Sequence, residues 1–350
     1  MRRVLTPTGH PAWLATSYDD VRLVLSDSRF GKAPLTSGPE TTRSGRLLPG
    51  LLFTTDPPEH TSLRDQLLAA MRMRPSRLLH DRLVAQADSL LVAATSDLVS
   101  SYAAPLAMWA IGTWLGVPAE DFSRCASWSS IVLSLNRFPG SVVEDAQRSL
   151  IDYMAGLASS GAATGLLAAL TVTATSPAPL AATVLATGYE TLVAGIANAA
   201  LTLLTSGPGF SSWPSSRVEV RRLIDELLRF APLGGTMRSR CALEDVSVGS
   251  VVVGKGDVVL AATGPANRDP ARFVAADQFC PARKDNRHMA FGVGERFCAG
   301  SQLAVMVLTV ALSRIAAHHP GIRLAVDPSD VVVLDGAAEP RPVALPVHWG

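Results

Sequence analysis

Apolar residues recur at helical spacing along most of this chain. Residues 78 to 160 read as successive amphipathic helices, and residues 217 to 230 form a strongly amphipathic pattern. The most apolar segment, residues 179 to 204, contains a single charge, Glu190, and is long enough to span a membrane. Because that acid lies near its centre, together with several Thr and Gly residues, we expect a buried core helix instead. Helices therefore dominate the predicted structure.

The patterns that predict strands are short and occur in a few places. Residues 12 to 30 predict a short strand followed by a helix, whereas residues 31 to 52 are rich in Gly, Pro, Ser and Thr and predict a loop. Alternating residues at 244 to 262 predict paired strands, and Val-rich residues 320 to 350 predict another set. We therefore expect small β-sheets beside the helices.

Composition and charge exclude several classes of protein. The 350 residues are 48% hydrophobic and 17% charged, which predicts an extensive interior, and the length allows one large domain or two. A net charge of +1 gives no support for a nucleic-acid or membrane partner. The cysteines form no CxxC pair, which argues against a zinc site, an iron–sulfur site or a disulfide framework and fits a reducing cytoplasm. They are Cys125, Cys241, Cys280 and Cys298.

The glycine-rich loop around Cys298 is the strongest candidate for chemistry. Cys298 directly precedes an apolar helical stripe, so it should lie near a helix N-terminus, where the helix dipole favours a metal-binding thiolate. Gly292 and Gly294 let the backbone approach a bulky or flat group, and Phe291 and Phe297 supply apolar walls. These features suit a planar metal cofactor.

A second candidate lies at residues 54 to 64. Asp56 is a plausible N-cap, and Glu59 three residues later completes a capping-box pattern. His60 and Arg64 then fall on one helix face, where they could bind a pair of carboxylates. A solvated basic face explains the same spacing equally well.

The long apolar helix and the amphipathic helix each contain a polar pair. Glu190 and Thr191 could pass protons through water, although spacing alone favours a Thr bonded to its own helix and a Glu that reaches a neighbour. Glu226 and Arg229, three apart in an apolar stretch, predict a partly buried ion pair. Gly188, before the first pair, is costly in a helix and suggests a close approach or a local opening of the hydrogen-bond ladder.

The Cys298 loop resembles that of the cytochrome P450 family, Phe-Gly-x-Gly-x-(His/Arg)-x-Cys-x-Gly, at every position. A lone cysteine before a helix is more often a small buried hydrophobe, and the complete pattern is what favours a ligand. The resemblance implies that Cys298 is the axial thiolate of a haem b iron, with the other loop residues around the cofactor. The matching residues are Phe291, Gly292, Gly294, Arg296, Cys298 and Gly300.

Other motifs of the family follow in the same order. Glu190 and Thr191 match its acid–alcohol pair, which implies a catalytic proton relay, and Glu226 with Arg229 matches its structural Glu-x-x-Arg motif. Gln278 stands where a third, charged partner of that motif is common. The resemblance further implies that five side chains contact the haem propionates. These are His60, Arg64, Arg240, His288 and Arg296.

The fold implied by the resemblance is a single mainly α domain (α+β) with small β-sheets, covering residues 1 to 350. Haem would lie between the helix at 179 to 204 and the Cys298 loop. The chain departs from the family in two places: little sequence precedes residue 12, and residues 155 to 180 leave less room than usual for a lid of two helices over the substrate.

The implied function is that of a haem-thiolate monooxygenase, which activates O2 and hydroxylates a small organic substrate, as in secondary metabolism. The chain contains no flavin or dinucleotide motif, so electrons would come from a ferredoxin and its reductase in the cytoplasm. Oxidative coupling, ring formation or peroxide-driven chemistry is one alternative, which the retained Glu190 and Thr191 disfavour. A non-catalytic haem-binding or recruitment protein is another. We expect the ferredoxin to dock where Arg72, Arg74, Arg287 and Arg296 cluster.

Overall fold

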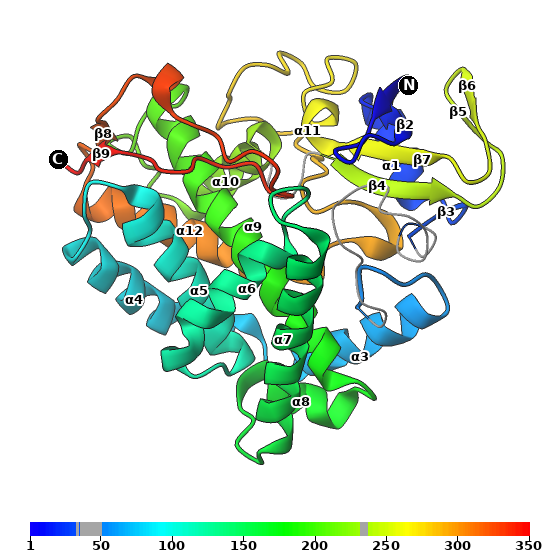
Figure 1. The fold of residues 1–350 in the computed structure, drawn as a ribbon. Coiled ribbons are helices and arrows are strands. Elements are labelled where there is room, and N and C mark those ends of the chain that lie inside the picture. Colours follow the sequence, from blue (N-terminus) through cyan, green and yellow to red (C-terminus); the bar gives the residue numbers. More distant parts are fainter. Residues whose placement is uncertain (33–34, 36–50, 232–236) are drawn as a thin grey trace.

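The computed structural model describes residues 1–32, 35, 51–231 and 237–350. Helices fill most of the molecule, and a sheet lies at one side (Figure 1); this sheet has five strands. This architecture confirms the predicted mainly α fold with small β-sheets. The α-helices are α1 (Tyr18–Ser26), α3 (Glu59–Met73), α4 (His80–Val92), α5 (Ala104–Leu115), α6 (Phe122–Val132), α7 (Gly140–Ser159), α8 (Gly165–Thr173), α9 (Pro177–Thr205), α10 (Arg217–Phe230), α11 (Thr263–Ala266) and α12 (Ser301–His318).

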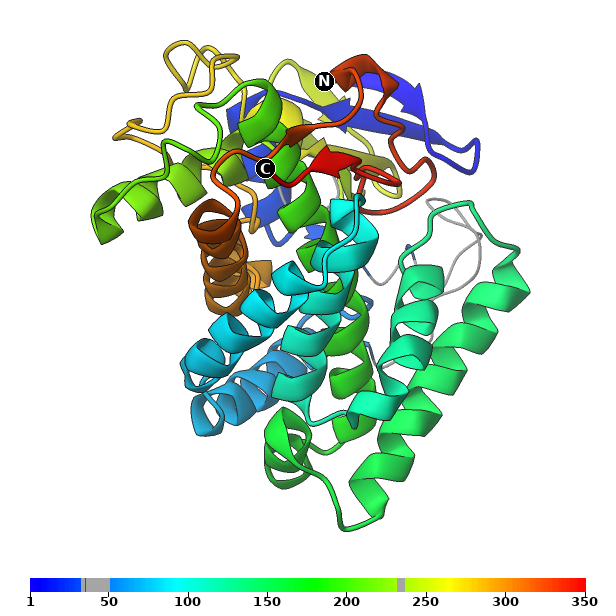
Figure 2. The same cartoon turned by 90° about the vertical axis from the view of Figure 1, so that its left-hand side faces the viewer.

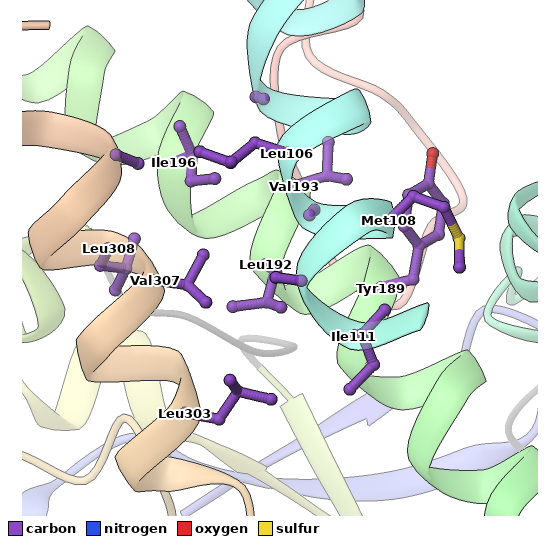
Figure 3. Close-up of a cluster of buried hydrophobic side chains, with 14 of the residues drawn as sticks. Leu106, Met108, Ile111, Tyr189, Leu192, Val193, Ile196, Leu303, Val307 and Leu308 are labelled. Atoms are coloured by element: carbon purple, nitrogen blue, oxygen red, sulfur yellow. The ribbon is translucent and has the colours of Figure 1, made fainter. Parts of the chain in front are cut away.

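Helix α9 is the centre of the helical core. It begins with Pro177 at its first turn, where the missing N–H costs nothing, and it packs against α5, α6, α7, α8 and α12. Its side chains lie between those of α5 and α12 (Figure 3). By length and composition α9 and α12 could each cross a membrane, but most of α9 is buried within the protein. A helix that is apolar on all sides and enclosed by others is a core helix, as we predicted.

The sheet positions one of the candidate residues. Its strand order is β1-β2-β7-β4-β3, with β2 parallel to β7 and the other pairs antiparallel. Central β7 is buried throughout, and β4 places Arg240 opposite Val259. The strands are β1 (Arg2–Leu5), β2 (Pro11–Ala15), β3 (Phe30–Gly31), β4 (Met237–Ala242), β7 (Val258–Ala262), and two separate pairs, β5 (Val246–Val248) with β6 (Val251–Val253) and β8 (Arg323–Leu324) with β9 (Val347–His348).

Two helices lie side by side over α9 (Figure 2). They are α6 and α7, and α7 buries residues at 143, 146, 150 and 154, the three- and four-residue spacing of an amphipathic helix. The segment 155 to 180, where we expected a shortened lid, contains the end of α7, all of α8 and the start of α9. The two helices that cover α9 are therefore α6 and α7, which come before residues 155 to 180 for most of their length. Most of the predicted loop at 31 to 52 lies outside the described residues.

Candidate functional site

The loop that contains Cys298 is a tight backbone turn. The Cys298 N–H donates to the carbonyl oxygen of Phe291 at 2.9 Å, which closes the loop. Gly292 and Gly294 have φ values of 72° and 75°, in the left-handed region that favours glycine. A Cβ on Gly294 would also lie 3.0 Å from the Cα of Ser26, so α1 packs directly against this turn. The close neighbour of Gly294 is thus a helix, and the approach of these glycines to a flat group stays a prediction.

The thiol of Cys298 lies before α12, whose first residue is Ser301 and whose N-cap is Gly300. Burial raises the pKa of this thiol, while a hydrogen bond from the Gly300 backbone and the charges of Arg238 and Arg64 act in the opposite direction. The backbone at the helix terminus therefore favours the thiolate, as we expected, but in the polypeptide alone desolvation outweighs this effect. A metal cation supplies the charge that deprotonates such a thiol.

Four of the five predicted propionate-binding side chains come together beside this loop. Arg64 of α3 donates from Nη2 to the carbonyl oxygen of Phe297 at 2.7 Å. His60, one turn earlier, is 3% exposed, and Arg240 of β4 is 5% exposed. Arg296, in the loop itself, forms an ion pair of 2.5 Å with Asp56. Three separate parts of the chain thus place cationic groups in one region, in which His60 and Arg240 are buried and Arg64 and Arg296 are half-buried.

The positive charge of this cluster exceeds its negative charge. Burial and the charges of Arg296 and Arg64 lower the pKa of His60 to about 4. Burial, with Arg296 and Arg238, lowers the pKa of Arg240 to about 9. The guanidinium of Arg240 donates only to the carbonyl oxygen of the adjacent Ser239 among the described residues. A buried cluster of this kind fits a ligand with two carboxylates, such as haem.

Asp56 has a different role from the predicted one. Helix α3 begins at Glu59 with Pro58 at the N-cap position, and no side chain caps it. The Asp56 carboxylate accepts instead from the backbone N–H of Lys32 at 2.8 Å and pairs with Arg296. The capping-box prediction is wrong because Asp56 forms an ion pair with Arg296 of the Cys298 loop. The local sequence pattern contains no information about this distant partner.

His288 is the predicted propionate contact that stands apart. Its Nε2 lies 3.9 Å from Oδ1 of Asp225 on α10, and its Nδ1 accepts from the backbone of Ala290. No contact joins it to the four clustered residues within the described ranges. Arg238 was missed by the sequence analysis, although it lies two residues before Arg240 on the same strand and therefore faces the same way.

The acid and the alcohol on α9 are each occupied elsewhere. Glu190 is 3% exposed, accepts from the hydroxyl of Ser130 on α6, and lies 3.5 Å from Nε of Arg341. Thr191 donates to the carbonyl oxygen of Thr187 at 2.6 Å. This geometry is the one that spacing alone favoured, a back-bonded Thr and a Glu that reaches a neighbour. The two side chains share no hydrogen bond in the part of the chain described.

Gly188 is explained by packing between helices. A Cβ at this position would lie 2.8 Å from Cδ1 of Ile111 on α5. Figure 3 shows Ile111 next to α9, near Tyr189. The close approach that we predicted is therefore an approach of α5, and no opening of the α9 hydrogen-bond ladder is needed to explain the glycine.

The predicted Glu226–Arg229 ion pair is confirmed and is completely buried, with a distance of 2.8 Å. Its third charged member is Arg283, whose Nε lies 3.0 Å from Oε2 of Glu226. Gln278, the residue at the expected place, contributes only its carbonyl oxygen, which accepts from Arg229. The network is therefore complete, although its third partner comes from a position five residues later than the motif indicates.

Known proteins resemble this chain over nearly its whole length. The family model described as cytochrome P450 matches residues 220–318. Nocardicin C N-oxygenase of Nocardia uniformis is 36% identical over 99% of this chain and 92% of that protein, and mycinamicin IV hydroxylase/epoxidase of Micromonospora griseorubida is 34% identical with the same coverage. The crystal structure of the LnmA cytochrome P450 hydroxylase from Streptomyces atroolivaceus superposes with a TM-score of 0.87 at 34% identity, covering 99% of this chain and 92% of that one.

Proposed function

The chain belongs to the cytochrome P450 family and is a haem-dependent monooxygenase, and we propose that Cys298, as a thiolate, would bind the iron of its haem b. It oxidises a small organic substrate. Because relatives are named for nocardicin C and mycinamicin IV, we infer that this substrate is a secondary metabolite and that the main reaction is hydroxylation. The observation that carries the cofactor assignment is the half-buried thiol of Cys298 beside a cluster with an excess of positive charge.

When bound, haem supplies the iron that activates dioxygen, and a thiolate ligand favours cleavage of the O–O bond. The chain positions this group from two sides. The Cys298 loop, with Phe291, Gly292 and Gly300, would hold it on one side, and α9 would lie on the other. His60, Arg64, Arg240 and Arg296 would bind its carboxylates, which would offset the cost of burying those cations.

The absorption spectrum of the reduced, carbon monoxide-bound protein tests this assignment. We expect a thiolate-type Soret band for the wild-type protein and its loss for Cys298→Ser, whose hydroxyl is a poor anionic ligand. Cys125→Ser is the matched control, because that thiol is buried in the helical core, and its spectrum should equal that of the wild type. An unchanged band in Cys298→Ser would contradict the proposal.

We assign the proton relay of this enzyme to Glu190 and Thr191. A carboxylate and a hydroxyl one residue apart can move a proton through water toward the reacting oxygen. Glu190 must first leave Ser130 and Arg341, which hold it on the side of α6 and the C-terminal segment. Glu190→Gln should therefore lower product formation by at least about tenfold, with a changed solvent isotope effect.

A small acidic ferredoxin is the electron donor that we propose, in a cytoplasmic setting. Arg72 and Arg74 are exposed at the end of α3, and Arg287 is exposed beside Asp285. Arg296, which we also expected on this face, is paired with Asp56 and largely buried, so it is left out. Reversing the charge of Arg72 and Arg74 should slow turnover at low salt. Equal turnover would refute the docking face, and Arg148→Glu on α7 is the control.

A further inference from the structure

Strand β4 presents two arginines on one face. It pairs with β7 in an antiparallel register that places Arg238 opposite Ala261 and Arg240 opposite Val259. Side chains two residues apart in a strand point to the same side of the sheet. Arg238 therefore faces the region in which Arg240 lies buried, while Ser239, between them, faces the other way.

The guanidinium of Arg238 is only partly used. Its Nη2 donates to the carbonyl oxygen of Ala290 at 2.9 Å, the residue just before the Cys298 loop. Its Nε is buried and has no hydrogen-bond acceptor. No carboxylate forms an ion pair with it in the described parts of the chain. A buried cationic donor without a partner is costly, and in native proteins it calls for a specific explanation.

The strand register and one hydrogen bond place this charge. Arg238 lies two residues from Arg240 on β4, near enough for its charge to lower the pKa of the Arg240 guanidinium, and its bond to Ala290 holds it beside the Cys298 loop. Within the cation cluster beside this loop, Asp56 pairs with Arg296 and its charge also acts on Arg240. This one carboxylate therefore stands against three guanidinium groups, those of Arg238, Arg240 and Arg296, and a ligand anion would balance the excess.

We propose that Arg238 is a cofactor-binding residue whose guanidinium, beside that of Arg240, binds a carboxylate group of haem at the edge of β4. This inference rests on the proposed haem-thiolate function. A carboxylate placed there would accept from the unpartnered Nε and balance two like charges at once. The Ala290 contact would remain and would fix the direction of the side chain.

The rate of haem loss to an excess of apomyoglobin tests this role. For the Arg238→Gln holoenzyme we expect loss about tenfold faster than for the wild type, the usual effect of one charge-assisted hydrogen bond. Arg238→Lys keeps the charge and should fall between them, which also covers the case that the Gln variant folds poorly. Arg2→Gln, on edge strand β1 of the same sheet and exposed, should lose haem at the wild-type rate.

Reconstitution with haem dimethyl ester identifies the group that Arg238 contacts. Esterification removes the carboxylate charge, so the difference between wild-type and Arg238→Gln should disappear with this cofactor. If the difference persists undiminished, Arg238 acts through Ala290 on the Cys298 loop, and the proposal is overturned. Equal loss of ordinary haem from both proteins also overturns it. Absence of a thiolate-type spectrum in the wild-type protein would instead refute the proposed function itself.

Discussion

Two buried arginine clusters in this protein differ in how completely their charges are satisfied. Arg229 is 0% exposed and donates to both oxygens of Glu226 and to the carbonyl oxygens of Asn267, Ala276 and Gln278. Arg240 is 5% exposed and donates only to its neighbour Ser239 within the described residues. The two arginine side chains are therefore almost equally buried, but of the two only Arg229 donates, in the described part of the chain, to a carboxylate that balances its charge.

The difference separates a structural cluster from a ligand-binding one. A buried ion pair whose donors and acceptors are all used fixes the local structure without needing another molecule. A buried cation that is short of acceptors lowers the stability of the polypeptide unless a ligand completes it. The Glu226 network locks α10 to the segment 276–286, and we propose that the cluster around Arg240 binds an anionic ligand.

The largest expected effect comes from breaking the complete network. Glu226→Gln removes the one acid that compensates both Arg229 and Arg283. We expect the free energy of unfolding to fall by about 3–5 kcal/mol, as when one partner of a buried pair is removed, measured by denaturant unfolding. The control is Arg221→Gln, which breaks the exposed pair with Asp225 and should cost less than about 1 kcal/mol. Similar losses for both variants would show that burial does not distinguish them.

Arg240→Gln should have opposite effects in the two forms of the protein. In the haem-free polypeptide it removes a buried charge that Asp56 compensates only in part, so the unfolding free energy should rise by about 1–3 kcal/mol. In the haem-bound protein it removes a carboxylate partner, so haem should dissociate faster. Thermal unfolding with and without haem measures both. A loss of stability in the haem-free form would mean that Arg240 is a structural residue like Arg229.

His60 provides a pH test of the same excess charge. Burial, with Arg296, Arg64 and Arg240 and against Asp56, lowers its pKa from 6.5 to about 4. Between these values the unfolded chain binds a proton that the folded chain does not. The unfolding free energy of the haem-free protein should therefore fall as pH drops through this window, by up to about 1.4 kcal/mol per pH unit.

Haem carboxylates would raise the pKa of His60, so the haem-bound protein should show a weaker dependence on pH. His60→Gln should flatten the curve of the haem-free protein, and His80→Gln, an exposed histidine on α4, should leave it unchanged. An equal slope in the two forms would mean that no anion reaches His60.

Local patterns predicted the residues of these clusters better than their partners. The Cys298 loop, the Glu226–Arg229 pair and the α9 core helix each lie within one short window, where spacing defines the geometry. The partners of Asp56 and Glu226 lie far away along the chain: Asp56 pairs with Arg296, and Glu226 takes Arg283 in place of Gln278. Only tertiary packing decides such contacts.

Arg238 is an intermediate case. Two-residue alternation along β4 would have found it, because Arg240 was already a candidate on the same strand. The motif gave no reason to look there, since it names one arginine. Arg238 and Arg240 lie on one face of β4, and this shared face is the signal that points to the second arginine.

The ion pair between Glu190 and Arg341 lies between the two arginine clusters in how far its charges are satisfied. Breaking it should have the smallest effect of the proposed changes. Arg341 lies 3.5 Å from Glu190, and its Nε makes no hydrogen bond. Arg341→Gln should release the carboxylate toward Thr191 and speed proton delivery by about two- to fivefold, the effect of a weak ion pair. The readouts are the ratio of product to peroxide and the solvent isotope effect. Arg341→Lys should restore both values, and Arg148→Gln on α7 should change neither. A loss of activity as large as that of Glu190→Gln would mean instead that Arg341 belongs to the relay.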